Sequence, residues 1–203
     1  MNMEKGQSCI KDVQFLKSVY SIKDLPDELP VEIAFAGRSN VGKSSLLNAI
    51  FGTRKFVKVS SRPGFTQCLN FFLINKKAYF VDLPGYGFAK APRKTIEKWQ
   101  KLIDAYFKSR NNLKAVVCIF DIRRALDELD IGLLNYLKSL NLRPLIVFNK
   151  ADKLSNNKIK TNLERAKIVI PYKDPSIFVV SAKTGKGVAD FINKAICPLI
   201  ESN

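Results

Sequence analysis

The chain has 203 residues, with 34 lysines and arginines against 18 aspartates and glutamates, a formal net charge of +16 and no histidine. The absence of histidine excludes an imidazole base, a Ser-His-Asp triad and any metal site built on histidine ligands. The excess of positive charge favours a polyanionic partner, either RNA or an acidic surface, although a general bias towards lysine would give a similar composition.

Length and cysteine use predict one intracellular domain. A chain of this size can bury a substantial core, and no linker-like change of composition divides it. The four cysteines, at positions 9, 68, 118 and 197, form no C-x-x-C pair, so we expect reduced thiols in the core or at the surface. No segment resembles a signal peptide or reaches the ~20 apolar residues of a membrane span. We therefore expect a cytoplasmic monomer without a membrane contact.

The first 30 residues contain Asp24, Pro26, Asp27 and Pro30, which interrupt any long helix. We expect residues 1–30 to form an extended arm beside the first strand of a single domain that covers residues 31–203.

Residues 31–51 have the pattern of a strand, a phosphate-binding loop and a helix. An apolar run stops at Gly37, the pattern G-x-x-x-x-G-K-S extends to Ser44, and apolar residues then return with helical spacing. Gly37 and Gly42 let backbone N–H groups converge on a phosphate, and the helix N-terminus adds its positive dipole end. Lys43 is expected to reach the β- and γ-phosphates, and Ser44 to bind Mg²⁺. A chance glycine-rich turn is the alternative, which the flanking elements argue against.

The rest of the chain alternates strands with helices. We expect a mobile loop over 53–67, a hairpin of strands 69–74 and 78–81, and buried strands over 116–120, 145–148 and 177–180. Apolar residues with helical spacing predict helices over 96–107 with core aromatics, 129–140, 159–166 after a Ser155 cap, and 188–199, where Pro198 should end or kink the helix. This order is typical of a doubly wound α/β sheet of about six strands, five parallel and one antiparallel at an edge, with helices on both faces.

Ligands of such sheets bind beyond the carboxyl ends of the strands. Asp82 ends one strand, where its carboxylate can hold Mg²⁺ through water, and the Gly85 N–H can approach the γ-phosphate. Thr66, in the mobile loop, can close over Mg²⁺ when a γ-phosphate is present.

Two further strand ends predict a guanine pocket. A carboxylate at Asp152 can accept from both N1–H and the amine of guanine, whereas adenine would leave that charge unpaired. Asn149 can bond the ring edge, Lys150 can lie along the base plane, and the Ala182 N–H, in the Ser181-Ala182-Lys183 segment, can donate to guanine O6. An isolated N-K-x-D is common in surface turns, but four motifs in order at strand ends are not.

With these residues in place, the chain resembles translation-factor-type GTPases and, specifically, the EngB family of bacterial ribosome-biogenesis GTPases. The resemblance covers nearly the whole chain and is carried by FLKSVYSIKDLP, AFAGRSNVGKSSLLNAI, SRPGFTQCLNFF, VDLPGYGFAKAPRK, DIRRALDELD and NKADKL. Two positions depart from that family, which commonly has Thr at the position of Asn149 and often has Thr at the position of Arg62.

The resemblance implies a Ras-like P-loop fold and a Mg²⁺-dependent, slow GTPase that acts as a switch in assembly of the large ribosomal subunit and is needed for normal cell division and septation. The expected nucleotide-binding residues are Gly37, Arg38, Ser39, Asn40, Val41, Gly42, Lys43, Ser44, Ser45, Gly64, Phe65, Thr66, Gln67, Cys68, Asp82, Leu83, Pro84, Gly85, Asn149, Lys150, Ala151, Asp152, Val180, Ser181 and Ala182. Mg²⁺ is expected at Ser44, Thr66 and Asp82.

Basic residues are spread over three segments that could contact rRNA phosphates, although a solvated surface is the simpler interpretation of any single one. They are Arg54, Lys55, Lys58 and Arg62; Lys90, Arg93, Lys94, Lys98 and Lys101; and Lys158, Lys160, Arg165 and Lys167. Two alternatives remain: a signalling or trafficking switch with a protein partner, which the lack of a lipidation motif weakens, and a tRNA-modification GTPase module, which usually comes with further domains.

Hydrolysis needs a different arrangement from that of Ras-like enzymes. Those enzymes have a Gln after D-x-x-G that orients the attacking water, whereas this chain has Tyr86. Neither Arg38 nor Arg62 can be assigned to the transition-state charge. Asn40 could instead help hold K⁺ against the phosphates, as in related GTPases, or could simply brace the loop. The expected catalytic set is Lys43, Asn40, Thr66 and Gly85.

Overall fold

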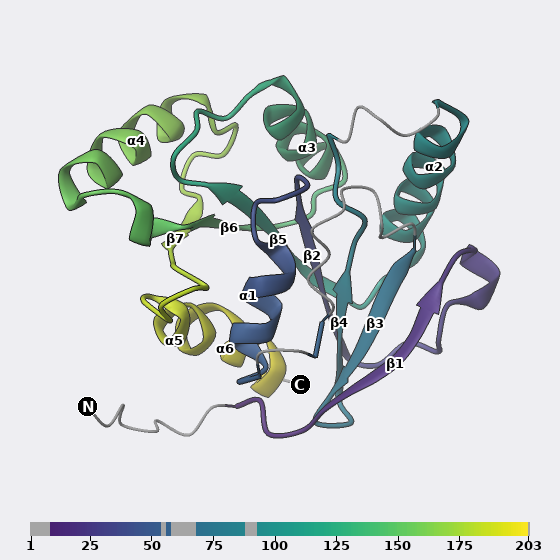
Figure 1. Ribbon diagram of the computed structural model, residues 1–203. Coiled ribbons are helices and arrows are strands. Elements are labelled where there is room, and N and C mark those ends of the chain that lie inside the picture. Colours follow the sequence, from purple (N-terminus) through teal and green to yellow (C-terminus); the bar gives the residue numbers. More distant parts are fainter. Residues whose placement is uncertain (1–8, 54–55, 58–67, 88–92, 203) are drawn as a thin grey trace.

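The computed structural model describes residues 9–53, 56–57, 68–87 and 93–202, without the side chains of residues 93–96 and 99. These residues form a mixed sheet of seven strands, in the order β1-β3-β4-β2-β5-β6-β7, between two layers of helices (Figure 1). The strands are β1 (Val13–Val19), β2 (Val31–Gly37), β3 (Leu69–Ile74), β4 (Ala78–Asp82), β5 (Leu113–Asp121), β6 (Pro144–Asn149) and β7 (Ser176–Val179). Strand β3 runs antiparallel to β4 and β1, and the other pairs are parallel. The expected doubly wound α/β fold is confirmed.

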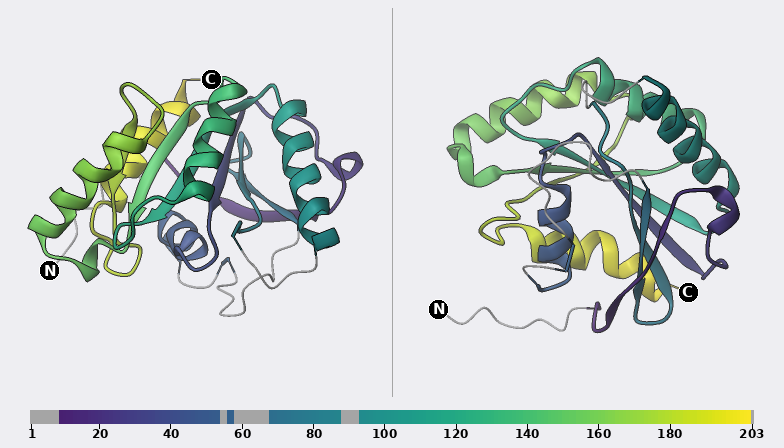
Figure 2. Two further views of the ribbon diagram at one scale, coloured as in Figure 1. Left: turned by 90° about the horizontal axis from the view of Figure 1, so that it is seen from above. Right: turned by 45° about the vertical axis from the view of Figure 1, so that its right-hand side comes forward.

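The helices cover both faces of this sheet. They are α1 (Lys43–Ile50), α2 (Arg93–Ser109), α3 (Glu128–Ser139), α4 (Asn156–Val169), α5 (Val188–Phe191) and α6 (Cys197–Glu201), and a π-helical segment, Ile192–Ile196, joins α5 to α6. Helices α1, α5 and α6 lie on one side, while α2, α3 and α4 lie on the other (Figure 2). No helix in the described part of the chain combines the length and apolarity that a membrane crossing requires.

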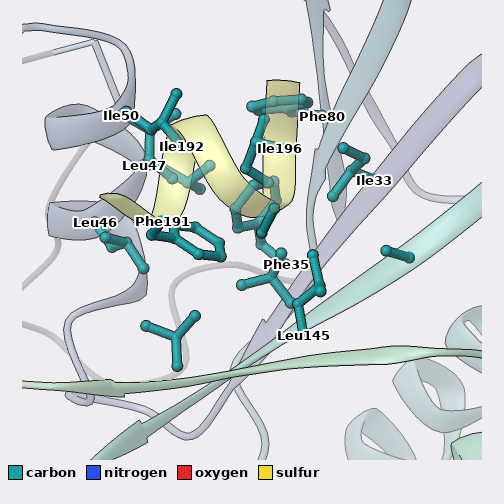
Figure 3. Close-up of a cluster of buried hydrophobic side chains, with 14 of the residues drawn as sticks. Ile33, Phe35, Leu46, Leu47, Ile50, Phe80, Leu145, Phe191, Ile192 and Ile196 are labelled. Carbon is teal, nitrogen blue, oxygen red and sulfur yellow. The ribbon is translucent and has the colours of Figure 1, made fainter. Parts of the chain in front are cut away.

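Strand β2 shows why the core has two halves. All seven of its residues are buried, since helices cover both of its faces. Ile33 and Phe35 point to one side, where they pack with side chains of α1 and of the C-terminal helices (Figure 3). Ala34 and Ala36 point to the other side, towards the core beneath α2, α3 and α4. Strand β2 therefore ends in the middle of the sheet, with the phosphate-binding loop directly after it.

The sheet has one strand more than expected because the N-terminal arm contributes β1. The arm was predicted to lie beside β2, but β1 instead pairs with β3 at the sheet edge. Its exposed and half-buried residues hide the alternation that would reveal a strand in the sequence. Strand β3 is therefore an inner strand, and the hairpin to β4 turns at Asn75 and Lys76, both with positive φ, as a short hairpin loop requires.

The cysteine prediction is wrong for one pair. Cys9 and Cys197 form a disulfide, with their Cα atoms 5.6 Å apart although the two residues are 188 positions apart in the chain. The fold brings them together because the start of the described chain passes close to the C-terminal helix (Figure 1). Cys68 and Cys118 are free and buried, as expected.

Two helical details also differ from expectation. In the predicted apolar stripe of α3, Leu137 is buried as expected but Leu129 is exposed, and Leu134 is buried although it lies outside that stripe. Pro198 neither ends nor breaks the C-terminal helix: it lies at the start of α6, where the missing N–H needs no acceptor, after the π-helical segment.

Candidate functional site

The phosphate-binding loop connects β2 to α1 and needs its second glycine. Gly42 has φ of 93°, and a Cβ added there would come within 2.5 Å of the Asn149 amide nitrogen. Asn40 also has a positive φ, of 68°. Helix α1 then begins at Lys43, so its first N–H groups face the loop interior. The local geometry is that of an anion-binding loop.

The loop and the end of β4 meet in a buried ion pair between Lys43 and Asp82. Asp82 is only 2 % exposed, and it is the last residue of β4, the neighbour of β2 in the sheet. Ser44 follows Lys43 in the first turn of α1. A carboxylate and a hydroxyl are hard oxygen ligands of the kind that Mg²⁺ prefers, so these two residues fit the ion. Gly64, Phe65, Thr66 and Gln67, which were expected to complete this part of the site, lie outside the described residues.

The segment after Asp82 is hydrogen-bonded to the phosphate-binding loop. The Tyr86 N–H donates to the Gly37 carbonyl at 3.3 Å, and the Ser39 N–H donates to the Tyr86 carbonyl at 3.2 Å. Gly85 packs so close to Ser39 that an added Cβ would lie 3.2 Å from the Ser39 hydroxyl. The structure thus places Gly85 directly against the phosphate-binding loop, and its contact with a γ-phosphate stays a prediction.

Two carboxylates of α3 hold side chains from this region, and their role was missed in the sequence. Arg38 pairs with Asp127, and the Tyr86 hydroxyl donates to Asp130 at 2.9 Å. Asp127 and Asp130 also cap α3 reciprocally through each other's backbone N–H groups. The D-x-x-D spacing before an apolar helix is the signal that could have revealed the cap.

Asn149 braces the site from within. Its amide nitrogen donates to the Val41 carbonyl at 3.0 Å, and its amide oxygen accepts from the Ala182 N–H at 3.0 Å. Asn149 is 2 % exposed. Asn149 thus links the phosphate-binding loop to the segment after β7. The contacts expected from Asn149 to the guanine ring edge and from Ala182 to guanine O6 stay predictions.

Asp152, the carboxylate expected to recognise the base, lies in the short helical turn Ala151–Lys153 after β6. The Ser181 hydroxyl donates to it at 2.6 Å, and this hydrogen bond lowers the pKa of Asp152, so the group stays ionised at neutral pH. Asp152 lines a cavity of about 720 Å³. The cavity also contains Gly42, Ser45, Asn48, Lys150, Ala182 and Lys183.

Asn48 is a second residue that sequence patterns did not reveal. Its amide oxygen accepts from the Val57 N–H at 2.7 Å, and its amide nitrogen donates to the Val57 carbonyl at 2.9 Å. Asn48 is buried in α1 and therefore fixes the chain that enters the loop after this helix. Nothing in its spacing from the phosphate-binding loop identifies this clamp.

The basic residues predicted to contact RNA are only partly described. Arg54, Lys55, Lys58, Arg62 and Lys90 lie outside the described residues, as do the side chains of Arg93 and Lys94. Lys98 and Lys101 on α2 are exposed, and so are four residues of α4: Lys158, Lys160, Arg165 and Lys167. Of these, Lys167 pairs with Glu164.

Comparison with known proteins agrees with this geometry. The model of a family described as "50S ribosome-binding GTPase" matches residues 32–150. Proteins named "Probable GTP-binding protein EngB" from Kosmotoga olearia and Petrotoga mobilis are 41 % and 43 % identical over 90 % and 94 % of this chain, and over 96 % of each relative. A crystal structure of a probable GTP-binding protein engB has a TM-score of 0.66 at 26 % identity, covering 85 % of this chain and all of that one. The crystal structure of an Aquifex aeolicus Era variant bound to GDP.AlF4- has a TM-score of 0.65 at 25 % identity, over 83 % of this chain and 56 % of that one.

Proposed function

This chain belongs to the EngB family of GTP-binding proteins, and we propose that it is a Mg²⁺-dependent GTPase that switches a step in assembly of the large ribosomal subunit. The observation that carries the proposal is the match of residues 32–150 to a family of 50S ribosome-binding GTPases. A cytoplasmic location and a role in cell division and septation are part of the same proposal.

The residues at the strand ends support nucleotide binding in three parts. Lys43 and the N–H groups of the loop would bind the phosphates. Ser44 and Asp82 would hold Mg²⁺, which when bound supplies positive charge against the phosphate oxygens. Asp152, kept ionised by Ser181, would accept the two adjacent donors of guanine.

Hydrolysis would use charge stabilisation by the loop without a glutamine. The hydroxyl of Tyr86 is engaged by Asp130, which supports our inference that Tyr86 does not orient the attacking water. We propose that Asn40 helps to hold K⁺ at the phosphates, where this ion would stabilise developing charge. Turnover measured in KCl and NaCl at matched ionic strength, with wild type and Asn40→Ala, tests this: a wild type indifferent to the cation refutes it.

The large excess of positive charge supports rRNA as the partner. Exposed lysines and arginines on α2 and α4 extend beyond the nucleotide site, so they are available for phosphate contacts. A signalling switch with a protein partner is the second candidate, and its binding would depend far less on salt.

Sedimentation with large ribosomal subunits separates these candidates. Tagged protein would be pelleted with subunits in the presence of GDP or a non-hydrolysable GTP analogue, at salt between about 50 and 200 mM. Each phosphate contact releases counterions, so a multi-contact RNA interface should lose on the order of a thousandfold in affinity over this range. Co-sedimentation that ignores both nucleotide and salt would contradict the proposal.

A further inference from the structure

A charged cluster at the end of β5 lies beside the proposed guanine pocket, and its central carboxylate has been given no role above. Its centre is Asp121, the last residue of β5, which is opposite Asn149 in the pairing of β5 with β6. The side chain of Asp121 is only 5 % exposed. A buried carboxylate at this place needs partners, and the two that it has are cations.

The first partner is Lys150, the residue after Asn149. The Lys150 ammonium lies 3.0 Å from Asp121 Oδ2 and donates to the Asn40 carbonyl at 2.5 Å. Lys150 also has a left-handed backbone, with φ of 68°, which a lysine adopts only when its surroundings determine it. Two acceptors, from β5 and from the phosphate-binding loop, thus fix the end of this side chain.

The second partner is Arg123, which binds the same carboxylate from the outside. Its Nε and Nη2 donate to the two oxygens of Asp121 at 2.9 and 2.6 Å, and its backbone N–H donates to Oδ1 at 3.1 Å. Arg123 therefore pairs with the Asp121 carboxylate but does not itself line the cavity.

We propose that Asp121 is a positioning residue for the guanine base and acts through Lys150. By holding the ammonium at Asn40, Asp121 keeps the Lys150 side chain along the wall of the cavity that also contains Asp152. Without this carboxylate, the long lysine side chain regains its rotamer freedom and the base loses a preformed surface. The inference rests on the proposed GTP binding.

The proposal distinguishes the base from the phosphates. Asp121→Asn should weaken GDP and GTP about tenfold each, because one charge-assisted contact that orders the base surface is lost. Inorganic triphosphate carries no base, so its affinity should change less than about twofold. Asp190→Asn is the matched control, since it removes the same charge from an exposed i,i+4 pair with Lys194, and neither residue lines the pocket.

A double-mutant cycle tests the route through Lys150. Affinities for GDP would be measured by calorimetry, and those for inorganic triphosphate by competition with a fluorescent GDP, for wild type, Asp121→Asn, Lys150→Met and the double variant. In the Lys150→Met background, adding Asp121→Asn should change the affinity for GDP by less than about twofold. Arg123→Gln leaves Lys150 as the remaining cation on Asp121 and should bind GDP like wild type.

Three results would overturn the inference. They are unchanged GDP affinity in Asp121→Asn, an equal loss for inorganic triphosphate, or additive losses in the double variant. If Asp121→Asn does not fold, Arg123→Gln serves as the test. A loss of GDP affinity in folded Arg123→Gln as large as that in Lys150→Met would show that the cluster only stabilises the local turn, and this would also overturn the inference. A wild type that fails to bind GDP would instead refute the proposed function itself.

Discussion

The hydroxyl of Tyr86 donates a 2.9 Å hydrogen bond to Asp130, and this bond links the segment after β4 to the first turn of α3. Burial raises the pKa of both groups, so the hydroxyl keeps its proton and remains a donor. Removing the hydroxyl with Tyr86→Phe leaves the ring in place and deprives a buried carboxylate of a donor. We expect the free energy of unfolding to fall by about 1 kcal/mol. Urea unfolding without nucleotide measures this, and an unchanged midpoint would show that water replaces the hydroxyl.

Asp152→Asn should change which base is preferred. An amide cannot accept from both guanine donors, but it can donate to the carbonyl that replaces the amine in xanthine. GDP and GTP should weaken on the order of a hundredfold, because two charge-assisted bonds are affected, and xanthosine diphosphate should bind more tightly than to wild type. Calorimetry checks both. Asp174→Asn, at an exposed position, is the control. An equal loss of affinity for guanosine and xanthosine diphosphates in Asp152→Asn would contradict the assignment of Asp152.

The buried pair of Arg110 and Glu32 should matter far more for stability than a surface pair. Glu32 is fully buried and accepts from Arg110 at 2.6 Å and from the Tyr106 hydroxyl at 2.5 Å. Arg110→Met leaves this charge uncompensated, so we expect a loss of about 3–5 kcal/mol. Lys194→Met breaks an exposed pair with Asp190 and should cost less than about 1 kcal/mol. Chemical denaturation compares the two, and similar losses would mean that Glu32 is protonated or hydrated after the change.

The disulfide between Cys9 and Cys197 should stabilise the oxidised protein. It closes a loop of nearly the whole chain, and such cross-links typically contribute about 2–5 kcal/mol. Cys197→Ala should therefore lower the free energy of unfolding without reductant and match wild type when a thiol reductant is present. Thiol titration of denatured, unreduced protein should find two free cysteines in wild type; four would contradict the bond.

Asp121 should make the free energy of unfolding depend on pH in the acidic range. Burial by itself would raise its pKa, but the hydrogen bonds from Arg123 and Lys150 outweigh burial and lower the pKa to about 2. An unfolded Asp titrates near ~3.9, so the contribution of ionised Asp121 is fully present above about pH 4 and is lost as the pH falls towards about 2. Unfolding measured across this window should show a flatter profile for Asp121→Asn than for wild type. Asp190→Asn should keep the wild-type slope, and equal slopes in all three proteins would exclude Asp121 as the source.

The sequence alone determined the fold class and the main parts of the site. Apolar residues at fixed periods predict strands and helices, because the period places these side chains on the one face of the element that is buried. The phosphate-binding loop could be predicted because its glycines and Lys43 must stand at fixed spacings, and Asp82 and Asp152 because strand ends meet at one edge of a parallel sheet.

Only the tertiary structure decided which groups share partners. The sequence did not reveal that the Asn149 amide is bonded to Val41 and Ala182; only the fold shows this. The links from Tyr86 to Asp130 and from Lys150 to Asp121 join residues 44 and 29 positions apart, and no local pattern encodes such distances. The same holds for β1, whose residues pair with residues of β3 that are 50 to 61 positions away, and for Cys9 and Cys197, which lie near the two ends of the chain. These contacts arise because packing of the sheet brings distant segments together, and periodicity records only which face of each segment is buried.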